Sequence, residues 1–124
     1  MNKVENLKIW RKAIELAKMV YVLETELPSD EKFGLTSQLK RSAVSVSSNI
    51  AEGAGRNSKK EFKHFLSIAN GSCYELQTQL ILLIELNLIE KAKVEPVIDL
   101  CFEIQKMNYS LQKSLVEAEL NTQY

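Results

Sequence analysis

Residue types that carry most enzyme and metal chemistry are scarce in this sequence. Its 124 residues include one histidine, two cysteines, one tryptophan, two prolines and four glycines. With a single histidine, His64, any Ser-His-Asp triad has to be built around that residue. Cys73 and Cys101 match no C-x-x-C spacing and fall on apolar stripes, so buried free thiols in a reducing compartment are expected. A disulfide between the two cysteines is the alternative.

Long apolar runs are also absent. The longest is Leu80–Ile84, whereas a membrane-spanning helix needs about 20 apolar residues. No signal peptide is recognised, because Met1–Glu5 leads straight into an amphipathic pattern. We therefore expect a soluble, cytoplasmic protein with no membrane partner.

Charge is balanced overall but unevenly distributed along the chain. Residues 1–64 carry 12 Lys+Arg and 8 Asp+Glu, and residues 65–124 carry 4 and 8. This asymmetry permits a basic face for phosphate, although a solvated helix surface would give the same counts.

The stretch from Phe33 to Leu80 contains two helical patterns. In the first, apolar residues recur at steps of three or four and predict one face on a core: Leu35, Leu39, Ala43, Val46 and Ile50. A neighbouring stripe of short polar residues, including Ser45 and Ser48, would let another helix approach closely. Gly53-Ala54-Gly55 is expected to end this helix through the left-handed backbone that glycine tolerates.

The second pattern begins at Ser58. Ser58 and Glu61 have the S-x-x-E spacing of a capping box, in which the hydroxyl accepts from the backbone N–H of Glu61. Helical spacing then continues to about Leu86, with Asn87 as a left-handed cap.

Two further helices flank this pair. The expected helices cover residues 7–27, 30–53, 58–86 and 93–120, and the second becomes regular only from about Leu35 because Gly34 weakens its first turn. Pro28 ends the first helix, and Pro96 is tolerated only near the first turn of the fourth, which begins between residues 91 and 95. The sequence therefore predicts an all-α fold, one domain over residues 1–124, arranged as an antiparallel up-down-up-down four-helix bundle.

The apolar run at residues 80–84 covers every side of its helix. A lone bundle would leave about half of these residues wet, so we predict a homo-oligomer with an interface at Leu80, Ile81, Leu82 and Ile84. The alternative is that this helix is the most central of the four.

Catalytic patterns around His64 are incomplete. Glu61-x-x-His64 has the spacing of di-iron bundle ligands, but those sites need a second such pair, and the chain has only one histidine. Arg56 and His64 resemble the Arg…His pair of helical ribonucleases, with Ser58 capping a helix between them. We predict no catalytic site, metal site or cofactor.

Basic residues gather around the start of the third expected helix. Arg56, Lys59, Lys60 and Lys63 lie where free backbone N–H groups and the helix dipole favour an anion, and Lys40 is expected to add to them. Phosphates of RNA would bind there mainly through charge. The alternative is that the lysines only keep the corner soluble.

A buried polar network is also expected inside the bundle. Its members are Arg41, Asn49, Glu52 and Glu75, which would have to be paired because unpaired buried polar groups cost stability. The network would set helix register or, alternatively, line a small-ligand pocket.

Four blocks of residues are similar to a known family. They are Leu7-Lys8-Ile9-Trp10 followed by Ala13; Phe33-Gly34-Leu35 with Gln38-Leu39-Lys40-Arg41; Ser48-Asn49-Ile50-Ala51-Glu52-Gly53 with Gly55-Arg56; and Ser58-Lys59-Lys60-Glu61-Phe62 and Phe65-Leu66 with Ala69, Gly71-Ser72, Tyr74-Glu75-Leu76 and Gln79. The chain resembles the bacterial four-helix bundle proteins named for open reading frames in 23S rRNA intervening sequences.

The resemblance implies a four-helix bundle assembled as a ring-like homopentamer. A relative is the accessory protein of diversity-generating retroelements, a basic pentamer that binds RNA and its reverse transcriptase. This sequence is neutral overall, whereas that accessory protein is strongly positive. The family has no established enzymatic activity, so no catalytic role is carried over.

Together these observations predict a non-enzymatic, homo-oligomeric binding or assembly module whose partners are its own copies and RNA or an RNA-associated protein. A protein-interaction scaffold without nucleic acid is the alternative. A ribonuclease or metal enzyme centred on His64 is the third reading.

Overall fold

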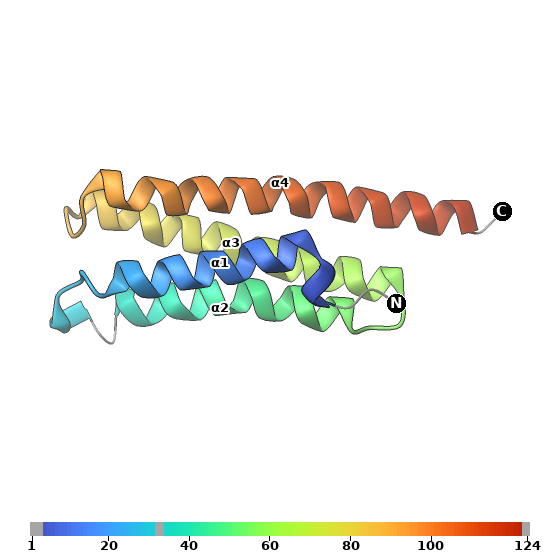
Figure 1. Cartoon of the computed structure of the whole chain (residues 1–124), viewed down its shortest axis with the longest axis horizontal. Coiled ribbons are helices and arrows are strands. Elements are labelled where there is room, and N and C mark those ends of the chain that lie inside the picture. The colour runs from blue at the N-terminus through green and yellow to red at the C-terminus, as the bar shows by residue number, and fades with distance from the viewer. Residues whose placement is uncertain (1–3, 32–33, 123–124) are drawn as a thin grey trace.

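The chain folds into four α-helices that lie along one axis. The computed structural model describes residues 4–31 and 34–122, with side chains as far as residue 118. Its helices are α1 (Lys8–Glu24), α2 (Leu35–Ala54), α3 (Lys59–Glu85) and α4 (Lys91–Thr122), with short 3-10 turns η1 (Val4–Asn6) and η2 (Ser29–Glu31). Successive helices run in opposite directions (Figure 1). The predicted all-α, antiparallel up-down-up-down bundle is confirmed.

Each helix packs against two neighbours: α1 and α3 both contact α2 and α4. Apolar residues at helical spacing meet in the centre, and the largest fully buried ones are Leu16, Leu39, Ile50, Leu66, Leu76, Leu80, Leu83 and Ile104. The longest helix, α4, has 32 residues and extends past the connection between α2 and α3 (Figure 1). One end of α4 therefore overhangs the bundle.

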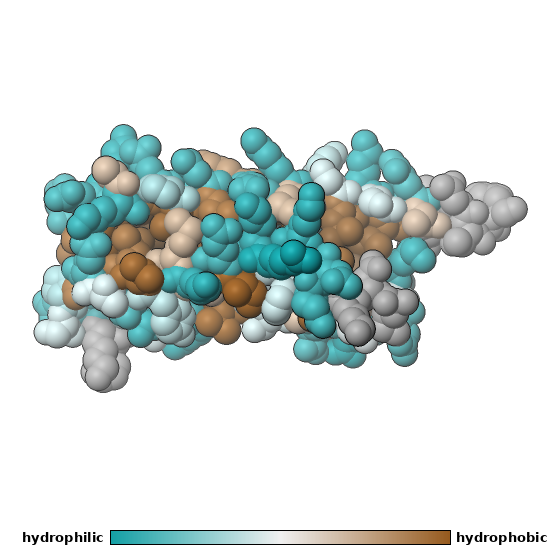
Figure 2. Space-filling view, in the orientation of Figure 1, coloured by the Kyte–Doolittle hydropathy of each residue, from teal (hydrophilic) through white to brown (hydrophobic). Residues whose placement is uncertain are grey.

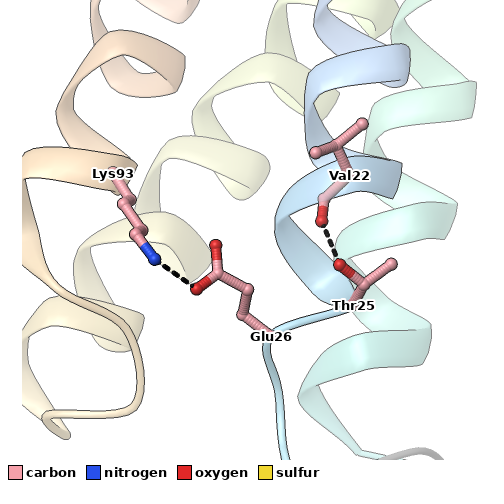
Figure 3. A network of polar contacts seen from close by, with 4 residues as sticks. All are labelled: Val22, Thr25, Glu26 and Lys93. Atoms are coloured by element: carbon pink, nitrogen blue, oxygen red, sulfur yellow. Dashed lines mark hydrogen bonds and ion pairs between the residues drawn. The ribbon is translucent and has the colours of Figure 1, made fainter.

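Helix α1 ends three residues earlier than expected. Its α-helical hydrogen bonds stop at Glu24, and i to i−3 bonds from the backbone N–H groups of Thr25, Glu26 and Leu27 continue the chain as turns. The Thr25 hydroxyl also donates to the Val22 carbonyl, at 2.6 Å (Figure 3). These side-chain and turn bonds tighten the chain before Pro28 is reached, which explains the early end.

An ion pair joins this end of α1 to the start of α4. The Lys93 ammonium donates to Glu26 Oε1 at 2.7 Å (Figure 3). That hydrogen bond and the negative charge of Glu26 raise the pKa of Lys93 above 10.5. The interaction therefore adds stability below pH 10.5 and is lost at higher pH as Lys93 deprotonates.

Gly53 has a different role from the predicted one. It lies inside α2, and none of the described glycines has a positive φ, so left-handed glycine does not end this helix. A Cβ placed on Gly53 would lie 2.8 Å from Phe65 Cβ and 3.0 Å from Phe62 Cδ1. Glycine is needed here because α3 passes too close to α2 for a side chain.

Both predicted caps of α3 are present. Ser58 Oγ accepts from the Glu61 backbone N–H at 3.1 Å, as in a capping box. At the other end Asn87 has a φ of 57°, in the left-handed region. The backbone N–H groups of Asn87 and Leu88 donate to the carbonyls of Ile84 and Leu83, respectively, in a Schellman motif. Specific capping contacts therefore define both the start and the end of α3.

The starts of α2 and α4 agree with the finer expectations for them. Helix α2 is regular from Leu35, as expected, and the segment from residue 30 begins with the separate turn η2. Residues 32–33 lie outside the described part of the chain. Helix α4 begins at Lys91, within the expected range of 91–95, because the Glu90 carbonyl already accepts from the backbone N–H groups of residues 93 and 94. Pro96 is thus the sixth residue of α4, on its exposed surface.

The two cysteines are free and buried, as predicted. Cys73 on α3 donates from its thiol to the backbone carbonyl of Cys101 on α4, at 3.5 Å. Interaction with the neighbouring Cys73 side chain and burial together raise the pKa of Cys101. The Cys101 thiol therefore stays protonated and behaves as a core residue.

Apolar side chains also reach the surface. Figure 2 shows them along the seam between α1 and α4. We call this seam the α1–α4 groove; it has a volume of about 550 Å³, and its apolar lining is Met19, Val22, Leu23, Pro96 and Val97. Within the described residues, no helix combines the length and apolar character that a membrane span requires.

Truncation of a central leucine should be costly. We expect Leu39→Ala and Leu76→Ala each to lower the free energy of unfolding by about 2–5 kcal/mol, because both side chains are almost wholly buried. Urea denaturation followed by circular dichroism measures the loss. Gln38→Ala, at an exposed position of α2, is the control and should change stability by less than about 0.5 kcal/mol.

The two helical glycines of α2 and α3 should respond in opposite directions to alanine. Gly53→Ala should cost about 1–3 kcal/mol, because its Cβ would overlap Phe65. Gly71→Ala should stabilise by about 0.5–1 kcal/mol, because no atom lies within 4 Å of its Cβ position and alanine favours helix. Thermal unfolding of both variants tests the pair, and a stabilised Gly53→Ala would contradict the close helix contact.

Candidate nucleic-acid interface

Four predicted cations lie together at one end of the bundle. Arg56 is in the α2–α3 connection, and Lys59, Lys60 and Lys63 lie in the first two turns of α3. All four side chains are exposed. We call these four residues the basic corner.

The start of α3 also presents backbone donors at the basic corner. The N–H of Glu61 is taken by Ser58 Oγ and that of Phe62 by the Ser58 carbonyl. The N–H groups of Lys59 and Lys60 have no acceptor within residues 4–31 and 34–122. Because the helix dipole also places positive charge here, this helix start suits an anion.

Arg56 is held in place by two neighbours. Its Nη2 lies 2.8 Å from Glu52 Oε1, and its guanidinium carbon lies 4.9 Å from the centre of the Phe65 ring. About half of each charged side chain is exposed, so water screens this ion pair. A phosphate can therefore compete with Glu52 for the guanidinium.

An open hollow of about 370 Å³ adjoins the basic corner. Its lining comes from the chain before α1, the end of α2, the α2–α3 connection, the start of α3, and α4: Leu7, Ala54, Arg56, Asn57, Ser58, Lys59, Phe62 and Leu115. Cationic and apolar side chains thus border the same depression.

The opposite end of the bundle has the reverse charge. Among the described residues, its connections and the helix ends beside them carry the cations Lys91 and Lys93 and a larger number of acidic residues: Glu24, Glu26, Asp30, Glu31, Glu85 and Glu90. Lys40 lies toward this end, fourteen residues before the end of α2 and so about 21 Å from the basic corner. Its ammonium is 3.3 Å from Glu24 Oε1 and 5.1 Å from the centre of the Tyr21 ring. The expectation that Lys40 joins the basic corner is wrong, because the length of α2 separates them.

The predicted buried polar network does not form. Arg41, Glu52 and Glu75 are exposed, and Asn49 is only half-buried. Glu52 pairs with Arg56, and Arg41 donates to a serine one turn earlier on its own helix. These side chains lie on outward faces of α2 and α3. Because water solvates them there, they do not have to form hydrogen bonds or ion pairs with one another.

Short hydroxyls instead join α2 to α3, as the polar stripe suggested. Ser45 Oγ lies 2.8 Å from Ser72 Oγ, and Ser42 donates to Glu75 Oε1 at 3.2 Å. Asn49 donates to the backbone carbonyl and hydroxyl of Ser45. These contacts fix the register of the two helices.

The apolar run of α3 is divided between core and surface. Leu80 is fully buried and Ile84 packs against the core, so Leu80 cannot contact another molecule. Ile81 and Leu82 are each 42% exposed. Of the four residues predicted for an interface, these two are the ones with substantial exposure.

His64 has no catalytic or metal-binding surroundings in the described part of the chain. Its side chain is exposed and its ring meets Phe65 edge-on, with ring centres 5.3 Å apart. No group of three His, Cys, Asp or Glu residues that could hold a metal occurs among the residues described.

A groove between α3 and α4 was not anticipated from the sequence. One part, of about 580 Å³, is lined by Ser67, Asn70, Asn108, Tyr109, Gln112, Lys113, Val116 and Glu117. A second part of about 380 Å³ shares Tyr109 and adds Tyr74, Phe102, Gln105, Lys106 and Ser110. We call both parts the tyrosine groove. Phe102 and Tyr109 fall outside the apolar stripe of α4, a pattern that could have indicated exposed aromatics.

Comparison with known proteins identifies a matching family and a similar solved structure. A sequence model described as 23S rRNA-intervening sequence protein matches residues 5–110. The solved structure of a protein of unknown function from the S23 ribosomal protein family of Bacteroides thetaiotaomicron is similar, with 29% sequence identity and a TM-score of 0.79. The similarity covers 85% of this chain and 98% of that one. No curated protein matches the chain.

Proposed function

Because the chain belongs to the 23S rRNA-intervening sequence protein family, we propose that it is a non-enzymatic, homo-oligomeric module that binds RNA through the basic corner. A ring of five copies is the assembly we propose. The observation that carries the RNA proposal is the gathering of four exposed cations beside two unpaired N–H groups at the start of α3.

Several features of the basic corner suit phosphate rather than a carboxylate within the protein. The three lysines are exposed, and no ion pair joins them to an acidic side chain among the described residues. Arg56 has a single exposed partner, Glu52. Such cations release counterions when they meet phosphates, which gives affinity with little dependence on base sequence.

The surroundings of His64 support the non-enzymatic part of the proposal. In nucleophile–histidine pairs a third group commonly orients the imidazole through a hydrogen bond. The ring that His64 meets is Phe65, a side chain that has no oxygen or nitrogen to accept such a bond.

Exposed apolar surface supports self-assembly. Ile81 and Leu82 are partly exposed on α3, and Val22 borders the apolar α1–α4 groove on another side of the bundle. Apolar surface on two sides of one subunit suits a ring, in which each copy presents different surfaces to its two neighbours. The same surfaces favour our second candidate, a scaffold that binds another protein and no RNA.

Removal of the basic corner should weaken RNA binding. We expect the Arg56→Ala, Lys59→Ala, Lys60→Ala and Lys63→Ala quadruple variant to lose at least about tenfold in affinity for a single-stranded RNA. The slope of log Kd against log salt should also decrease by about 0.7 for each phosphate that the variant no longer neutralises. Fluorescence anisotropy at several salt concentrations measures both quantities.

A matched variant separates the basic corner from net charge. Replacing Lys18, Arg41, Lys91 and Lys93 by alanine removes the same charge from exposed positions outside the basic corner. This variant should retain wild-type affinity. Equal losses in the two variants would mean that the basic corner is not the RNA site.

The native mass tests self-assembly. Light scattering on a sizing column should give a mass of about five chains of 14.1 kDa. Ile81→Asp and Leu82→Asp should lower that mass, because burying an unpaired carboxylate opposes association. A monomeric wild-type protein with an ordinary circular dichroism spectrum would refute the assembly proposal without affecting the RNA proposal.

A further inference from the structure

We propose that the tyrosine groove binds the unpaired bases of single-stranded RNA whose phosphates lie on the basic corner, an inference that rests on the proposed function. The groove would take two or more neighbouring bases, one in each of its two parts.

The groove exposes aromatic rings that contribute little to the core. Tyr109 is 71% exposed and Tyr74 52%, and Phe102 lies beside them. Exposed aromatics arranged along a groove are the usual platforms on which proteins stack the bases of single strands. Stacking tolerates any sequence because every base has a flat face.

The groove continues directly from the basic corner along α3. Five residues of α3 recur at steps of three and four and therefore occupy one face of the helix: Lys60, Lys63, Ser67, Asn70 and Tyr74. Ser67 donates to Gln112 on α4 at 3.3 Å, which shows that this face borders α4. A strand bound at the lysines can therefore pass into the groove without crossing another helix.

Charge along the groove favours a phosphate backbone. Lys113 lines the first part and Lys106 the second, and Glu117 is the single acidic residue that lines either part. With Lys63 one helical turn before Ser67, cations border the groove along its length. A protein partner would instead be favoured by a mainly apolar lining, such as that of the α1–α4 groove.

One polar atom in the groove has no partner. Asn108 Nδ2 donates to the Leu66 carbonyl and Gln112 Nε2 to Asn108 Oδ1, so these amides are used within the protein. Asn70 Oδ1 is buried and has no hydrogen-bond partner among the described residues. RNA bases carry N–H donors on their Watson–Crick edges, which are free only in single strands. A base in the groove supplies this donor once the Asn70 side chain turns toward it.

The test compares single-stranded and duplex RNA of equal length, about 12 nucleotides per strand, which is within the range of single-strand sites. We expect the Tyr74→Ala and Tyr109→Ala double variant to bind the single strand at least about tenfold more weakly. Binding of the duplex should not change, because its stacked bases do not enter the groove and its phosphates contact the basic corner. Fluorescence anisotropy gives both affinities.

Two control variants identify the role of the rings. Tyr74→Phe with Tyr109→Phe keeps the stacking surfaces and should bind the single strand like the wild type. Tyr21→Ala removes a comparably exposed tyrosine from α1 and should also leave binding unchanged. Circular dichroism and light scattering of each variant show whether fold and native mass are preserved.

The outcomes separate this inference from the proposed function. If the wild type binds neither RNA, the proposed function fails and the inference fails with it. If the basic-corner variant loses RNA but the tyrosine double alanine variant does not, the inference alone is overturned. It is also overturned if the tyrosine double alanine variant changes the native mass, because the groove would then be a contact between protein chains.

Discussion

The close approach of α2 to α3 is the constraint on which the rest of the structure depends. At Gly53 the backbone of α2 passes so near Phe65 that a Cβ has no room, and farther along Ser45 and Ser72 meet directly. The connection between these helices is only residues 55–58. Because the helices remain in contact up to this connection, the first turns of α3 lie at the end of the bundle and their lysines face solvent.

Regular features of the fold could be predicted because they depend on neighbours in the sequence. Steps of three and four residues place Leu39 and Leu76 in a core, and the caps at Ser58 and Asn87 need only residues within one or two turns. Boundaries were less accurate where turns compete with helix, as after Glu24. The helix-ending role predicted for Gly53 is wrong, because a close contact with another helix leaves no local pattern in the sequence.

The positions of polar residues around each helix could be predicted less accurately than the apolar core. A polar side chain beside an apolar stripe points either to a neighbouring helix or to water, and the stripe alone does not say which. Ser45 points to the neighbouring helix, whereas Arg41 and Glu52 point to water. The predicted place of Lys40 is wrong because fourteen residues of α2 lie between it and the α2–α3 connection. The tyrosine groove depends on two helices whose register the sequence does not give.

The overhang of α4 contributes to the two surfaces proposed to bind RNA but little to the buried core. The family match stops at residue 110, yet Gln112, Lys113 and Val116 line the tyrosine groove and Leu115 lines the hollow at the basic corner. Few residues after 110 belong to the buried core. Under the proposed function, substitutions at exposed positions of these last turns would alter the RNA-binding surface and leave the buried core of the bundle unchanged.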